Sequence, residues 1–104
     1  MAYIDLKTAS LTLIEMVKHD NQRLVELCLL GNANINFQDE TGMTPLMWAV
    51  LKGNKEMVSL LLDAGALFGI NIKDNNGHTA IEQARMKNAS EMVQLLENAI
   101  EKSA

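Results

Sequence analysis

The sequence has few of the residues on which secreted, metal-binding or strand-rich domains depend. Its 104 residues contain one cysteine, one proline and one tryptophan, and aromatic residues make up only 4%. The lone cysteine, Cys28, cannot form an internal disulfide. The apolar residues, 48% of the chain, are mainly Leu, Ile, Val, Ala and seven methionines, and this profile favours helices over strands. We therefore expect one helical domain, residues 1–104, with a substantial core.

A basic block and long apolar runs are also absent. Nine basic and thirteen acidic residues give a net charge of −4, so nucleic acid and anionic membranes are poor candidate partners. No apolar run approaches the roughly 18–20 residues that span a bilayer. The opening segment MAYIDLKTAS lacks the pattern of a secretory signal. Together with the single cysteine, these absences predict a soluble cytoplasmic protein.

The chain contains an internal repeat. TGMTPLMWAVLKGNKEMVSLLL, from Thr41, matches NGHTAIEQARMKNASEMVQLLE, from Asn76, at an offset of 35 residues. A fainter copy, NQRLVELCLLGNA from Asn21, matches NKEMVSLLLDAGA from Asn54 at an offset of 33. Such self-similarity is the signature of a repeat architecture. The positions at which the two stronger copies are identical include, in the first of them, Asp39, Gly42, Thr44, Ala49, Lys52, Glu56, Met57 and Val58.

Each copy predicts two helices and a tight turn. Thr44 is a typical N-cap, with Pro45 at the first helical position and the helix ending at Lys52. A second helix, Lys55–Asp63, has apolar residues at helical spacing and ends before Gly65. Between copies, INFQDETGMT and INIKDNNGHT each contain Asp-x-x-Gly, which is typical of a tight, hairpin-like turn.

This order of turn, short helix and longer helix, with Thr-Pro-Leu-x-x-Ala opening the first helix, resembles the ankyrin repeat. The resemblance covers roughly residues 10–100, with a specific second copy, a good third copy and a degenerate first copy. It implies an all-α ankyrin-repeat solenoid of stacked helix-turn-helix units with hairpin-like turns. The approximate repeats are 6–38, 39–73 and 74–104.

The ends of the array differ from its middle. In the third copy Arg85, Gln83 and Glu97 replace Val50, Trp48 and Leu62, as expected for a polar cap at the end of a stack, and the last helix is expected to continue to EKSA.

In the first copy Ser10 or Thr12 is expected to cap the first helix, Thr12 with Glu15 as a capping box. With Met1 at one end and a polar cap at the other, we expect a complete small protein.

Two features depart from the family pattern. Met47, Glu82 and Ile14 stand where the family usually has a histidine that ties turn to helix, so we expect a less rigid turn in each repeat. The segment AGALFGIN is two residues longer than its counterpart GNANIN. Its Phe68 is expected to fold back over the helix ends, with an exposed aromatic contact for a partner as the alternative.

The methionines and the single tryptophan could either fill the core or contact a partner. We expect Met57 and Met92 to be core residues, Met47 to be half-buried and Trp48 to lie between helices, with an interface as the alternative for Trp48.

Convergent polar groups for catalysis are missing from the pattern. His19 and His78 lie at different repeat positions, and Cys28 is expected to be a buried apolar residue. DNNGHTAIE lacks both anchoring carboxylates of a calcium loop. We therefore expect no enzyme activity, no cofactor and no metal site.

The resemblance implies that turn tips and the exposed side of each first helix form a concave protein-binding surface. The helix positions form two rows, one with Lys18, Leu51 and Met86 and one with His19, Lys52 and Lys87. Cationic and apolar rows on an acidic protein would suit a partner with an acidic, amphipathic surface; alternatively, the lysines simply solvate an unused face. The candidate partner-binding residues are Glu40, Thr41, Met43, Leu51, Lys52, Asn75, Asn76, His78, Met86 and Lys87.

The predicted function is that of a non-catalytic adaptor or inhibitor that binds another protein, and we expect a monomer. The alternative is a structural module that associates with itself through its degenerate first repeat, which has Tyr3, Ile4 and Leu6 ahead of it.

Overall fold

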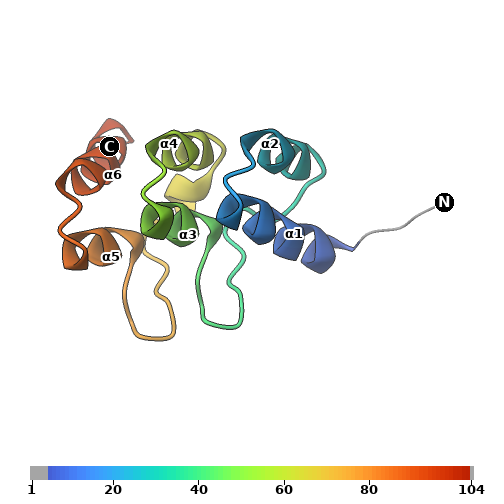
Figure 1. Cartoon of the computed structure of the whole chain (residues 1–104), viewed down its shortest axis with the longest axis horizontal. Helices are drawn as coiled ribbons and strands as arrows, with labels where there is room; N and C mark the ends of the chain where they lie inside the picture. The colour runs from blue at the N-terminus through green and yellow to red at the C-terminus, as the bar shows by residue number, and fades with distance from the viewer. Residues whose placement is uncertain (1–4, 104) are drawn as a thin grey trace.

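The computed structural model describes residues 5–103. Figure 1 shows two rows of helices, with α1, α3 and α5 in one row and α2, α4 and α6 in the other, and two loops that project beyond the first row. Within residues 5–103 there is no β-strand, and the predicted all-α solenoid is confirmed. The elements are α1 (Leu6–Lys18), α2 (Gln22–Leu30), α3 (Pro45–Lys52), α4 (Lys55–Asp63), the short 3-10 helix η1 (Ala66–Gly69), α5 (Ala80–Met86) and α6 (Ser90–Lys102).

The second repeat, α3 with α4, has the predicted helix limits. Thr44 Oγ1 accepts the N–H of Met47 at 3.2 Å, and Pro45 occupies the first turn. Gly53 then ends α3 in the left-handed conformation, with φ of 71°. Asn54 caps α4 by accepting the N–H of Met57 at 3.1 Å. Local capping signals therefore set both helices of this repeat.

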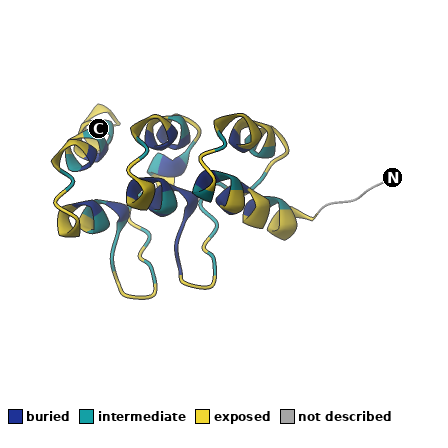
Figure 2. Ribbon diagram, in the orientation of Figure 1, coloured by how far each residue is buried: buried dark blue, intermediate teal, exposed yellow. Residues whose placement is uncertain are grey.

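The core lies between the two rows and between successive repeats. In Figure 2 the buried residues gather where the rows meet, and the exposed ones cover the outer sides of the helices. Met57 and Leu61 of α4 are fully buried, and Met92 and Leu96 of α6 are 3% and 0% exposed. The core positions predicted for Met57 and Met92 are therefore confirmed, whereas Met47, expected to be half-buried, is only 1% exposed.

The first helix begins earlier than predicted. Asp5 is its N-cap and accepts the N–H of Thr8 at 2.7 Å. Ser10 lies inside α1, where its hydroxyl donates to the Leu6 carbonyl and accepts the N–H of Asn34 at 2.8 Å. The predicted cap at Ser10 or Thr12 is wrong, because an aspartate at position 5 is as good a cap and no Gly or Pro interrupts the residues after it.

The residues that replace the family's histidine close two of the turns in another way. Met47 Sδ accepts the N–H of Thr44 at 3.5 Å. Glu82 Oε1 accepts the N–H of Thr79 at 2.9 Å, and this backbone hydrogen bond holds the pKa of the Glu82 carboxyl below its usual value. Other hydrogen bonds thus replace those of the family's histidine in the second and third repeats, and the lower rigidity of the turns stays a prediction.

Candidate functional site

The first turn is organised by one carboxylate. Asp39 accepts hydrogen bonds from the Thr41 N–H (2.9 Å), the Thr41 hydroxyl (2.6 Å) and the Met43 N–H (3.0 Å). Its other oxygen accepts the indole N–H of Trp48 at 2.8 Å. Burial raises the pKa of Asp39, but these hydrogen bonds together outweigh it, so the pKa lies below its usual value. The ionised carboxylate therefore ties the turn to α3.

The second turn repeats this arrangement with a different partner. Asp74 accepts the backbone N–H groups of Asn76 and His78, at 2.9 and 3.0 Å, and the amide of Gln83 at 2.8 Å. The hydrogen bond from the His78 backbone is the largest of the effects that lower the pKa of Asp74. Gln83 thus replaces Trp48 as the donor nine residues after the aspartate. Sequence reasoning missed this link, although both aspartates and their donors keep the same spacing in the two copies.

The two turns are hydrogen-bonded to each other. The backbone N–H of Asn75 donates to the Thr41 carbonyl at 3.0 Å, and the Asn75 amide donates to the Glu40 carbonyl at 2.8 Å. Gln38 reaches the Lys73 carbonyl at 2.9 Å. The turn tips therefore form one continuous platform, and their exposed side chains keep a fixed spacing.

On the helices beside this platform, Lys18 lies against Trp48. Its ammonium is 4.3 Å from the centre of the indole ring, within the range of a cation–π contact. Lys18 also lies 3.5 Å from a carboxylate oxygen of Glu15. Because Asp39 holds the indole N–H, the half-buried Trp48 connects the first turn to Lys18 of α1.

Two further basic side chains, Lys52 and Lys87, contact the preceding repeat, whereas His19 contacts a residue of its own repeat. Lys52 Nζ lies 3.7 Å from Asp20 Oδ2, at the end of the preceding repeat's first helix. Lys87 Nζ donates to the Leu51 carbonyl at 2.7 Å. His19 Nε2 lies 3.8 Å from Glu15. Lys52 and Lys87 thus link one repeat to the next while their side chains remain exposed, 40% in the case of Lys52.

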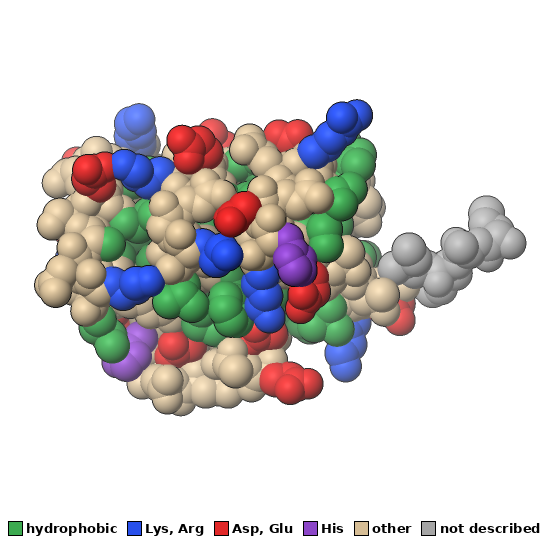
Figure 3. Space-filling model, in the orientation of Figure 1, with side chains coloured by type: hydrophobic (Ala, Val, Ile, Leu, Met, Phe, Trp, Pro, Cys, Tyr) green, Lys and Arg blue, Asp and Glu red, His purple; other side chains and the backbone are tan. Residues whose placement is uncertain are grey.

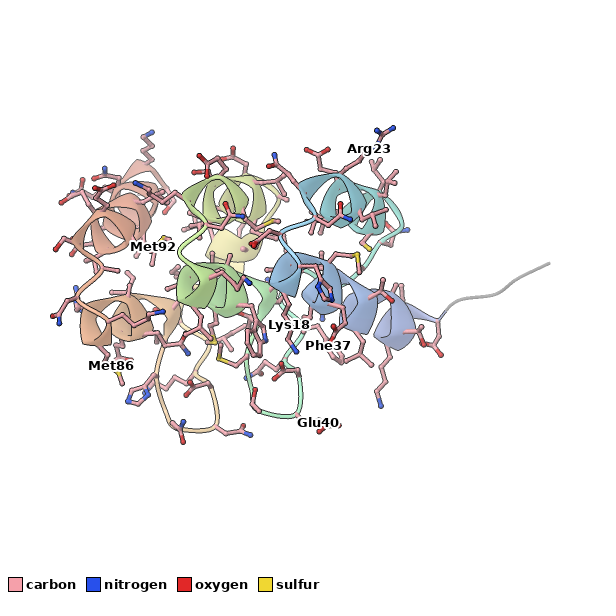
Figure 4. All side chains as sticks on the ribbon, viewed as in Figure 1. Lys18, Arg23, Phe37, Glu40, Met86 and Met92 are labelled. Carbon is pink, nitrogen blue, oxygen red and sulfur yellow. The ribbon has the colours of Figure 1, made fainter. Side chains whose placement is uncertain are left out.

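Apolar side chains lie between these cations. Leu51 and Met86 are 41% and 63% exposed. Figure 3 shows hydrophobic and basic side chains side by side over the first-row helices, and in Figure 4 Lys18 and Met86 point to the side on which Glu40 marks the tip of a turn. We call this set the turn-side surface; its members are Lys18, His19, Glu40, Thr41, Leu51, Lys52, Asn75, Asn76, His78, Met86 and Lys87.

One predicted member lies elsewhere. Met43 is 8% exposed, and its sulfur accepts the Gln83 amide at 3.4 Å. The prediction that Met43 is a turn-tip contact is wrong, because the next repeat packs over it. The remaining candidates are exposed, apart from the half-buried His78.

The inserted segment also differs from expectation. η1 buries Ala66, which is 1% exposed, and leaves Phe68 95% exposed. The prediction that Phe68 folds back over the helix ends is wrong, because the single 3-10 turn directs the two side chains to different sides.

No group of three His, Cys, Asp or Glu side chains is close enough to hold a metal ion within residues 5–103. Burial raises the pKa of the Cys28 thiol, which disfavours the thiolate needed for nucleophilic chemistry. None of the helices described here is long and apolar enough to cross a membrane.

Comparison with known proteins agrees with this architecture. A family model described as "Ankyrin repeats (3 copies)" matches residues 13–104. The mouse DNA-binding protein RFXANK is 56% identical over 39 residues, which cover 38% of this chain and 14% of that protein. The human 2-5A-dependent ribonuclease is 46% identical over 55 residues, 52% of this chain and 7% of that protein. Rat Caskin-1 is 49% identical over 45 residues, 40% of this chain and 3% of that protein.

The chain thus spans only a small part of the length of these relatives. Ankyrin repeats generally mediate protein–protein interaction and are generally non-catalytic. The matched segment covers most of the length of this chain and contains both turns and all the helices except the first part of α1. The chain belongs to the ankyrin-repeat family.

Proposed function

We propose that the chain binds another protein through the turn-side surface, acting as an adaptor or an inhibitor. The observation that carries this proposal is the placement of exposed apolar side chains between basic ones. The row that contains Leu51 and Met86 lies beside the row that contains Lys52 and Lys87, on a chain whose net charge is −4. A surface of this kind favours a partner with an acidic, amphipathic face.

The internal contacts of the lysines do not prevent this. The side chains of Lys52 and Asp20 are 40% and 46% exposed, so their ion pair is a surface pair worth less than about 1 kcal/mol. An incoming carboxylate can share or replace such a contact at little cost. The hydrogen bonds of Asn75 hold the two turn tips together, which lowers the entropy lost on binding.

The test begins with affinity capture from cytosol and continues with the purified partner. The double variant Lys52→Glu, Lys87→Glu should weaken binding at least about tenfold, since it sets two carboxylates against an acidic partner. A matched control, Arg23→Glu with Lys102→Glu, carries the same net charge but changes two exposed residues of α2 and α6. In Figure 4 Arg23 points away from the turns.

The control should bind as the parent chain does, and both variants should keep the parental melting temperature within a few degrees. Equal binding by the parent chain and the Lys52/Lys87 variant would show that the partner uses a different surface.

A further inference from the structure

A groove lies between α2 and α4, the second helices of the first two repeats. It has a volume of about 530 Å³, and its lining comes from these two helices and the residue that follows α4. In Figure 1 the two helices are neighbours in the second row, away from the projecting turns. Both walls belong to adjoining repeats, so the groove does not arise from an end of the stack. We call it the second-row groove; its lining residues are Glu26, Leu29, Leu30, Leu60, Asp63 and Ala64.

Leu30 is the residue of this groove that packing between repeats does not explain. Its side chain is 80% exposed, and among the large apolar side chains of residues 5–103 only that of Phe68 is more exposed. The other two copies have Asp63 and Asn98 at the same position, both exposed. The stack therefore has no need of a leucine there. Because Leu30 adjoins Leu29 and Leu60, it extends an apolar surface, which is typical of an interaction site.

The groove between α4 and α6 (Ser90–Lys102) provides a comparison within the same molecule. At the repeat offsets of 33 and 35 residues, every residue of the second-row groove has a counterpart in the lining of that groove. Asp63 stands there in place of Leu30, Ser59 in place of Glu26, and Lys102 lines it as well. The same place in the fold is therefore mainly apolar with an acidic rim in one case, and polar with a basic residue in the other.

Both charged residues of the second-row groove are acidic. Glu26 lies on the α2 wall and Asp63 on the α4 wall, and both are exposed. Within residues 5–103 neither carboxylate forms an ion pair. Glu56 adds a third acid one turn before Leu60 on α4. The groove therefore favours a basic group on either side of an apolar one.

The basic residues of the same two helices lie outside the groove. Arg23 is one turn before Glu26 on α2, but it does not line the groove, and in Figure 4 its side chain points outward on the side of α2 away from α4. Lys55 of α4 is paired with Glu91 of α6, on the other side of α4. The chain itself thus leaves the acidic rim of the groove without a cation.

We propose that the second-row groove binds a basic amphipathic segment of another protein. Bulky apolar side chains of the segment pack on Leu29, Leu30 and Leu60, and its Lys or Arg side chains pair with Glu26 and Asp63 on the two walls. The groove shares no residue with the turn-side surface. Because the rows on the turn-side surface are basic and this rim is acidic, the two surfaces select partners of opposite charge, and binding at one does not depend on the other.

The test uses two synthetic peptides of about 14 residues, close to the shortest length that forms a helix in water. One contains leucines at helical spacing with lysines between them, and the other has glutamate in place of each lysine. Each is added to the isotope-labelled chain up to about 1 mM, which covers weak complexes, while backbone amide shifts are recorded by NMR. The leucine–lysine peptide should shift amides in residues 26–31 and 60–65, and the leucine–glutamate peptide should leave these amides unchanged.

Two pairs of variants separate the apolar and the charged parts of the groove. Leu30→Asn, which gives this position the residue type of the third repeat, should weaken binding of the leucine–lysine peptide at least about tenfold. Its matched control is Leu6→Asn, at a leucine that is 62% exposed at the start of α1, which should bind like the parent chain. Glu26→Gln should weaken binding about threefold, whereas Glu101→Gln, which removes an equal charge near the end of α6, should leave it unchanged.

All four variants change exposed residues and should keep the parental melting temperature within a few degrees. Amide shifts that spread over the whole second row, equal binding of the two peptides, or no shift at the highest peptide concentration would overturn the proposal. Equal losses of affinity in Leu30→Asn and Leu6→Asn would overturn it as well, because the peptide would then bind outside the groove.

Discussion

The helices α2 and α4 occupy equivalent places in the first and second repeats, and both have nine residues. Four residues of α4 are buried, namely Met57, Val58, Leu61 and Leu62, whereas α2 buries only Val25. Their apolar patterns are nearly the same, so the difference arises from the neighbours. The α4 helix lies between two other repeats, and α2 has a repeat on one side of it in the described chain. Burial in a solenoid is thus a property of position in the stack as much as of sequence.

The sharpest way to test this comparison is to truncate the same repeat position in both helices. Leu61→Ala should lower the free energy of unfolding by about 3 kcal/mol, because the fully buried side chain leaves a cavity. Cys28→Ala should cost less than about 1 kcal/mol in dilute solution, where the half-buried thiol is partly hydrated. Urea unfolding at neutral pH measures both.

The parent chain, measured under the same conditions, is the control for this pair of variants. Equal costs at both positions in dilute solution would contradict the difference in burial.

The two turns allow a second comparison, with a smaller expected effect. Gly42 and Gly77 both have positive φ, 78° and 83°, but a Cβ at Gly42 would lie 2.6 Å from the backbone nitrogen of Asn75. A Cβ at Gly77 would meet nothing within 4 Å. Gly77→Ala should therefore cost about 1 kcal/mol of conformational strain, and Gly42→Ala about 2 kcal/mol or more.

Thermal unfolding of the two glycine variants, beside the parent chain, provides the measurement. Similar losses would mean that the turns are not held together as the hydrogen bonds of Asn75 indicate.

Local features were predictable and contacts between repeats were not. Thr44, Pro45 and the glycine after Lys52 predict the limits of α3 because capping depends on a few consecutive residues. Met43 looks like a turn-tip residue in one repeat, yet it is buried because the next repeat covers it. The prediction for Phe68 was wrong for a similar reason. The two-residue insertion has no equivalent in the other copies, so the direction of the Phe68 side chain could not be inferred from them.

In the candidate site, too, features within one repeat could be predicted and contacts between repeats could not. Repeat positions predicted which side chains of the helices are exposed, including Leu51 and Met86. The contact of Lys18 with Trp48 depends on packing between α1 and α3 and had no local signal. A signal for the link between Asp39 and Trp48 did exist, because Asp74 and Gln83 repeat its spacing.

The turn aspartates give the smallest of the expected effects and a dependence on pH. The folded-state pKa of Asp39 lies below the ordinary value of 3.8, so its stabilising contribution is present above about pH 4 and is lost as the pH falls toward the lowered value. Asp39→Asn should therefore lower the free energy of unfolding by about 1–2 kcal/mol at pH 7, through weaker hydrogen bonds to the turn and to Trp48.

The matched variant is Asp74→Asn, which should lower the free energy of unfolding by less than Asp39→Asn does. Asp74 accepts the amide of Gln83 in the outermost turn of the described chain, whereas Asp39 accepts the indole N–H of Trp48, which packs against Lys18. Urea unfolding at pH 7 and at about pH 2.5 separates the contributions. At the lower pH the parent chain should lose part of its advantage over both variants, since protonation weakens the same hydrogen bonds that the substitutions weaken. A difference between the parent chain and Asp39→Asn that stays constant with pH would show that the charge of Asp39 does not stabilise the turn. In that case the uncharged hydrogen bonds and the packing of the Asp39 side chain beside Trp48 would account for its contribution to stability.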